Sequence, residues 1–140
     1  MTSNHKATSK TVMGFDFGMG KIGVAIGQSI TGTANPLTII KARDGIPNWD
    51  QVGKLIEEWL PAVLVVGLPL NMDDTPSDMS RLAEKFSRKL HGRFNLPCVT
   101  VDERLTSFEA ASRSDRDEPV DAIAAQLILE TYFRELPPVS

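Results

Sequence analysis

Short apolar runs separated by turn residues fill the first third of the chain and predict strands. Thr11 to Gly27 holds two such runs around a glycine-containing turn, a pattern typical of a β-hairpin. Leu37 to Ile40 predicts a third strand, and Lys41 to Asn48 is expected to be a loop. Pro36 cannot donate to a ladder, so this strand should lie at a sheet edge or begin just after the proline.

Helical periodicity then appears in two segments. Apolar residues recur every three or four positions from Trp49 to Leu60, and Pro61 ends that helix. Thr75, followed by a proline and an acid, is the expected N-cap of a second helix, which should end at Gly92.

The continuous apolar segment Ala62 to Gly67 predicts a central strand covered on both faces, and Pro97 to Val101 predicts the next strand. A short helix is expected from Thr106 to Ala111, and a final helix follows Pro119. The order β-β-β-α-β-α-β-α-α predicts an α/β fold, with a mixed sheet covered by helices.

The composition limits the class of protein. The 140 residues are expected to form one domain at 11–136, between a flexible lead at 1–10 and a tail at 137–140. A net charge of −3 restricts any nucleic-acid surface to a local patch. The single Cys98 is expected to be a buried thiol in a reducing compartment. The chain has neither a signal-peptide pattern nor a membrane-spanning apolar run, so the expected location is the cytoplasm.

Three acids are candidate metal ligands. Asp16 and Glu103 end two predicted strands, and Asp121 lies in the first turn of the last helix. One turn later Ala124 and Ala125 leave room for that helix to approach the sheet. Clustered carboxylates repel each other unless a cation joins them, and oxygen donors favour Mg²⁺ or Mn²⁺. Two such ions would support phosphodiester cleavage.

Basic residues on the second helix are the candidate phosphate contacts. Lys85, Arg88 and Lys89 lie away from its apolar stripe, and Lys21 follows the glycine turn of the hairpin. An ordinary solvated face is the alternative interpretation. Trp49 lies on the apolar side of its helix, which favours a position in the core over a role in stacking on bases.

Four motifs in sequence resemble the YqgF/RuvX family. They are Asp16-Phe17-Gly18 followed by IGVA at 22–25, VVGLPLN at 65–71, DERLT at 102–106, and Asp121 followed by Ala124-Ala125. The resemblance implies a ribonuclease H-like fold, with a mixed five-stranded sheet containing one antiparallel strand. It also implies a metal-dependent nuclease that matures the 5′ end of 16S ribosomal RNA, first proposed as a Holliday junction resolvase.

The resemblance also assigns roles to residues. Asp16, Glu103 and Asp121 would be the catalytic acids and metal ligands, with Asp102 a weaker candidate because adjacent strand residues point to opposite faces. Arg104 would hold Asp102 or contact a phosphate. The segment 112–120 is shorter than in typical members and lacks their basic pair, which leaves the mode of substrate binding open.

Several functions compete with RNA maturation. A sugar kinase or actin-like ATPase would need a second domain, and Gly20-Lys21 does not fit a P-loop. A non-catalytic ribonuclease H-like binding module is a further alternative, although such modules commonly lose one of the acids. A resolvase of branched DNA would require a dimer. The sequence lacks an evident dimer helix, which favours a monomer acting on pre-rRNA, with the assembling ribosomal subunit as a possible partner.

Overall fold

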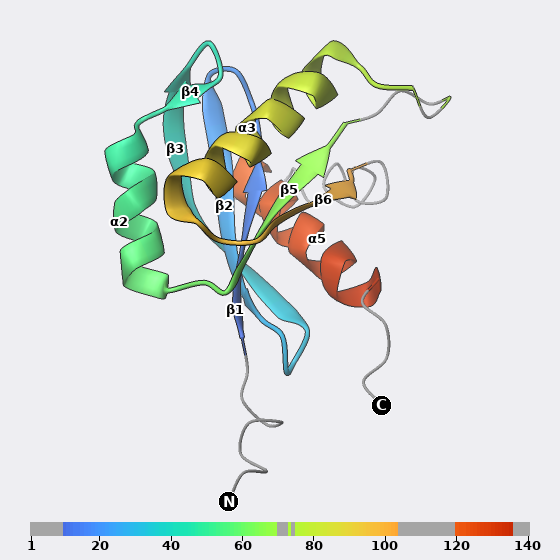
Figure 1. Ribbon diagram of the computed structural model, residues 1–140. Helices are drawn as coiled ribbons and strands as arrows, with labels where there is room; N and C mark the ends of the chain where they lie inside the picture. Colours follow the sequence, from blue (N-terminus) through green and yellow to red (C-terminus); the bar gives the residue numbers. More distant parts are fainter. Residues whose placement is uncertain (1–9, 70–72, 74, 104–119, 136–140) are drawn as a thin grey trace, which may run out of the picture.

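The computed structural model describes residues 10–69, 73, 75–103 and 120–135 (Figure 1). Its elements are β1 (Thr11–Asp16), β2 (Lys21–Gln28), β3 (Thr33–Arg43), β4 (Ile46–Pro47), α2 (Trp49–Trp59), β5 (Val63–Leu68), α3 (Asp78–Phe94), β6 (Cys98–Asp102) and α5 (Val120–Glu135). The helix expected at 106–111, the lead at 1–9 and the tail at 137–140 lie outside the described residues. No helix in the described part is long and apolar enough to cross a membrane.

The strands form one mixed sheet in the order β4-β3-β2-β1-β5-β6. β1 pairs in parallel with β5, and β5 in parallel with β6, while β2 runs antiparallel to both β1 and β3. The five long strands therefore match the expected sheet with one antiparallel strand. The described sheet has a sixth strand, β4, which the sequence prediction did not include.

The loop expected from Lys41 to Asn48 is wrong on both sides of its central turn, because strands occupy the residues before and after that turn. β3 continues to Arg43, and Ala42 and Arg43 pair with the two residues of β4. Asp44 and Gly45, with φ of 53° and 79°, form the turn between them. An Asp-Gly pair favours such left-handed conformations, and this local signal was overlooked. Pro36 lies in the part of β3 that does not pair with β4, where β3 forms the edge of the sheet, as expected.

The expected boundaries of α3 are also wrong. Ser77 is the N-cap: its Oγ accepts from Ser80 N–H at 3.0 Å, and Ser80 Oγ accepts from Ser77 N–H at 2.8 Å. The Thr75 hydroxyl instead donates to Asp73 Oδ1 at 2.6 Å. The helix passes Gly92 and ends where Asn95 takes a left-handed conformation, because Phe94 packs against the core on that side.

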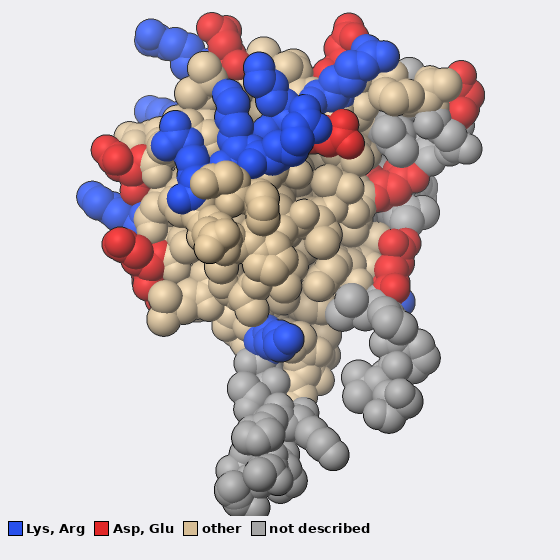
Figure 2. All heavy atoms as spheres, viewed as in Figure 1, with Lys and Arg blue, Asp and Glu red and all other residues tan. Residues whose placement is uncertain are grey.

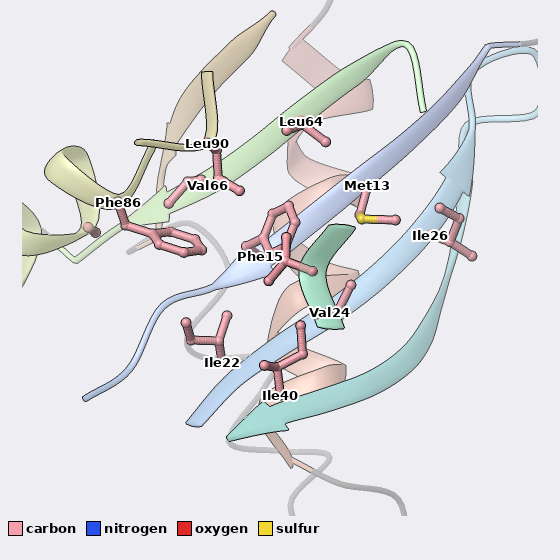
Figure 3. Close-up of a cluster of buried hydrophobic side chains, with 12 residues drawn as sticks. Met13, Phe15, Ile22, Val24, Ile26, Ile40, Leu64, Val66, Phe86 and Leu90 are labelled. Carbon is pink, nitrogen blue, oxygen red and sulfur yellow. The ribbon is translucent and has the colours of Figure 1, made fainter. Parts of the chain in front are cut away.

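Helices cover both faces of the sheet. α2 and α3 pack on one face over a core that includes Met13, Phe15, Val66, Phe86 and Leu90 (Figure 3). α5 lies on the opposite face, behind the sheet as drawn in Figure 1. This arrangement confirms the expected fold class and gives each sheet residue one of two chemical surroundings.

Candidate active site

The alternation of side chains along β1 decides which face Asp16 belongs to. Met13 and Phe15 belong to the core under α2 and α3, whereas Val12 belongs to the core under α5. Asp16 follows the parity of Val12 and Gly14, because successive strand residues point to opposite faces. The half-buried Asp16 therefore lies on the α5 face, at the carboxyl end of β1.

Glu103 lies on the same face, two strands away. It follows β6 with the parity of Val101, which packs under α5, and its N–H donates to Leu68 O at 2.9 Å. A Cβ placed on Gly67 would lie 3.5 Å from Glu103 Cδ. In the parallel register Phe15 pairs with Val66, so Asp16 is next to Gly67 on its other side. Gly67 thus lies between the two acid-bearing positions, and the Ile128 side chain of α5 packs over it, since a Cβ there would lie 2.5 Å from Ile128 Cδ1.

The last helix approaches the sheet closely where small residues meet. A Cβ on Gly14 would lie 2.6 Å from Leu129 Cγ and 3.2 Å from Ala125 O, so only glycine fits there without a shift. Ala125 is fully buried and Ala124 is half-buried, so the expectation of small residues at the contact holds best for Ala125.

The direction of α5 brings its first turn to the acidic end of β1. Phe133 contacts the position of Gly27, which pairs with Val12, whereas Leu129 contacts Gly14, so α5 runs antiparallel to β1. From Ala125 back to Asp121 the helix rises about 6 Å, and from Gly14 to Asp16 the strand advances about 6.6 Å. The backbone of Asp121 is therefore level with Asp16; its side chain lies outside the description.

Asp102 is separated from these acids by its position on β6. It pairs with Leu68 and has the parity of Cys98, whose contacts belong to the core under α2 and α3. Asp102 is thus directed to the opposite face from Glu103. Among the side chains that the structure describes, no three His, Cys, Asp or Glu residues group closely enough to hold a metal. The side chain of Asp121 is not among those described.

The predicted basic residues lie on a different surface. Lys85, Arg88 and Lys89 are exposed on α3, and Figure 2 shows Lys and Arg gathered over this helix. Arg88 Nη1 is 3.7 Å from Glu84 Oε1, an exposed pair of small energetic value. Lys21 is exposed at the start of β2, and Arg104 lies outside the described residues. The structure therefore brings Asp16 and Glu103 together, with the cations on α3 across the sheet.

Comparison with known proteins identifies the family. A family model described as "RuvX: Holliday junction resolvase" matches residues 10–135. The chain belongs to the RuvX family. A relative from Pseudomonas putida, named "Putative pre-16S rRNA nuclease", is 57% identical over 91% of this chain and 96% of its own length. A relative of the same name from Azotobacter vinelandii is 53% identical over the same shares of the two chains.

Solved structures of resolvases share the fold of this RuvX member at low identity. RuvC of Thermus thermophilus in complex with a Holliday junction substrate superposes with a TM-score of 0.56 and 13% identity, over 89% of this chain and 93% of that one. The fowlpox virus Holliday junction resolvase gives 0.55 and 14%, over 90% and 99%. The expected ribonuclease H-like fold and the nuclease class are confirmed.

Two glycines that shape the space around the acids, Gly14 and Gly67, had no predicted role. A glycine inside a strand signals a close approach by another group, and this local signal is present at both positions. The contacts of Phe17 and Trp49 depend on packing between residues far apart in the sequence, so no local pattern predicts them.

Proposed function

We propose that this RuvX protein is a metal-dependent nuclease that cleaves pre-16S rRNA during maturation of its 5′ end. The observation that carries the proposal is the position of Asp16 and Glu103 on either side of Gly67, on one sheet face. The backbone of Asp121 is level with Asp16 on the helix that covers this face. The relatives named for pre-16S rRNA support the substrate.

The donor groups suit Mg²⁺ or Mn²⁺. Asp16 and Glu103 offer carboxylate oxygens, which hard divalent ions prefer, and Gly67 adds no side chain of its own between them, although Ile128 of α5 packs over it. Asp16, Glu103 and Asp121 would hold the ions. When bound, such ions polarise the scissile phosphate and activate a water for attack on phosphorus.

The chain's own residues would bind and orient the substrate. The acids hold the reacting phosphodiester at the carboxyl end of β1, while Lys85, Arg88 and Lys89 on α3 attract the flanking phosphates. Lys21, at the start of β2, and Arg104, which follows Glu103 in the sequence, are further candidate phosphate contacts. Asp102 faces the other side of the sheet and serves a structural role in this proposal.

Branched DNA is the second candidate substrate, because the matching family model is described as a Holliday junction resolvase. Symmetric cutting of a junction requires two active sites in one dimer. RNA maturation places no such requirement on the protein, so a monomer acting in the cytoplasm, alone or on the assembling ribosomal subunit, suits the first proposal. A binding module without catalysis would fail to cut either substrate.

The test compares cleavage of a labelled RNA spanning the 16S 5′ end with cleavage of a four-way DNA junction. Each reaction contains Mg²⁺, Mn²⁺ or EDTA. We expect metal-dependent RNA cleavage that Asp16→Asn abolishes, because the amide has no negative charge and only one oxygen to offer a cation. Asp102→Asn and the exposed surface control Glu57→Gln should cleave at near wild-type rates. Cleavage by Asp16→Asn at the wild-type rate would exclude Asp16 as a ligand.

A further inference from the structure

A pocket of about 110 Å³ opens on the α3 side of the sheet, beside the residue that follows Asp16. Its walls come from the turn after β1, the turn between β3 and β4, the first residue of α2, and α3. Three aromatic residues line it: Phe17, Trp49 and Phe86. The volume is small for a whole mononucleotide, since pockets for complete small ligands usually exceed about 300 Å³. It suits one flat group.

The walls of the pocket are held in place by packing and by backbone hydrogen bonds. Gly45 N–H donates to Met19 O at 2.9 Å, which ties the β3–β4 turn to the turn after β1. Gly45 has φ of 79°, and a Cβ there would lie 2.8 Å from Phe17 Cζ, so the Phe17 ring packs directly on the turn. The pocket is therefore formed before any ligand arrives.

The aromatic surface is preorganised in the same way. The Trp49 and Phe86 rings stack with centroids 5.9 Å apart and planes inclined by 24°. Phe17 lies 5.3 Å from Phe86, and the Arg93 guanidinium carbon is 4.3 Å from the Trp49 ring centroid. Trp49 is half-buried: it packs against the core and also lines the open pocket. The part of its side chain in the pocket is available to a flat ligand. Stacking of bases on such rings tolerates any base sequence.

Cations at the rim complement a phosphate backbone. On α3, Arg81 pairs with Asp78 at 3.1 Å and Arg88 with Glu84 at 3.7 Å. Lys85 and Lys89, which line the pocket one turn apart, make no ion pair within the described residues.

One acid, Asp44, also lines this pocket. Its carboxylate can accept from an exocyclic amine of a base, which a bare phosphate ligand does not offer. The lining thus suits a base flanked by phosphates better than an isolated anion.

We propose that this pocket binds one unpaired nucleobase of the substrate strand, while Lys85 and Lys89 contact its adjoining phosphates. The inference rests on the proposed function, because Asp16 and Phe17 are neighbours at the end of β1. Their side chains belong to opposite faces of the sheet, so a strand whose phosphodiester reaches Asp16 would place a base in the pocket by passing around this end of β1. A base stacked inside a duplex cannot enter such a site without being extruded. The preferred substrate is therefore single-stranded beside the cut.

The test measures binding of a fluorescein-labelled single-stranded RNA of mixed sequence by anisotropy, in EDTA so that cleavage is excluded. Leu82→Trp fills the pocket from its 38% exposed lining residue, and about tenfold weaker binding is expected. The double variant Lys85→Gln, Lys89→Gln should reduce the slope of log K against log salt by about 1.4. Arg81→Gln, an exposed cation on the same helix outside the pocket, is the matched control and should bind as wild type.

Two further measurements identify the group that binds. An RNA with consecutive abasic sites should bind wild-type protein weakly, with the affinity that intact RNA has for Leu82→Trp. Blunt duplex RNA should bind weakly to wild type and to Leu82→Trp. In a Trp59→Phe background, intact RNA should quench Trp49 fluorescence. Equal binding of intact and abasic RNA by wild type, or full affinity of Leu82→Trp, would overturn the pocket.

Because these binding assays contain no metal, they are independent of catalysis. A protein that cuts RNA but shows no pocket effect retains the proposed nuclease function. A protein that binds through the pocket but does not cut loses that function and keeps the base site.

Discussion

Gly14→Ala tests the close approach of α5 to the sheet. The added Cβ would lie 2.6 Å and 2.9 Å from Leu129 Cγ and Cδ2, and 3.2 Å from Ala125 O. Leu129 is fully buried, and the carbonyl belongs to the helix backbone, so neither group can yield without moving α5. Overpacking of this kind costs about 1–3 kcal/mol. The smaller entropy of the unfolded alanine chain returns roughly 0.5 kcal/mol.

The expected net loss for Gly14→Ala is about 0.5–2.5 kcal/mol, measured by urea unfolding. It corresponds to a fall in Tm of roughly 2–8 °C for a chain of this size. Gly20→Ala is the matched control, because nothing lies within 4 Å of its Cβ position, and its Tm should rise slightly through the same entropy effect.

Adding Leu129→Ala to Gly14→Ala should cost less than the sum of the two single changes, since each relieves the other's volume defect. RNA cleavage by Gly14→Ala should also fall at temperatures where the variant stays folded, because α5 carries the proposed ligand Asp121 and small displacements of such a group are costly. An unchanged Tm and an unchanged rate would refute the packing of α5 on β1.

Three other predictions concern local features. Gly53→Ala in α2 should raise stability by about 0.5–1 kcal/mol in urea unfolding, because its Cβ would make an ordinary 3.6 Å contact with Phe94; a loss would contradict that spacing. Ser77→Ala should cost about 1 kcal/mol and Thr75→Ala less, and the reverse order would restore Thr75 as the cap. Burial raises the pKa of the Cys98 thiol, against an opposing hydrogen bond from Ser87, so native protein should react with iodoacetamide more slowly than unfolded protein at pH 8.5. Above about pH 9 the unfolded thiol ionises first, so stability should fall there, and less so in Cys98→Ala.

Local sequence patterns were sufficient to predict most elements of the fold. The hairpin, the buried strand β5 and the helix from Trp49 follow from periodicity and turn residues that act within a few positions. Errors arose where two local signals competed. Thr75 and Ser77 both suit an N-cap, and the choice was decided by Ser80, which completes the reciprocal pair with Ser77. Gly92 suggested an end to α3, but packing of Phe94 extended the helix.

The sequence alone determined the residue types of the candidate site, its family and the βα order of the chain. Tertiary structure decided which acids share a face. Parity along β1 and β6, together with the parallel registers of β5, directs Asp16 and Glu103 to one face of the sheet, on either side of Gly67, and Asp102 to the opposite face. Tertiary structure also decided that α5 packs on β1 in the antiparallel direction, which brings the backbone of Asp121 level with Asp16. Such relations depend on the pairing of strands far apart in sequence, and no local pattern encodes that register.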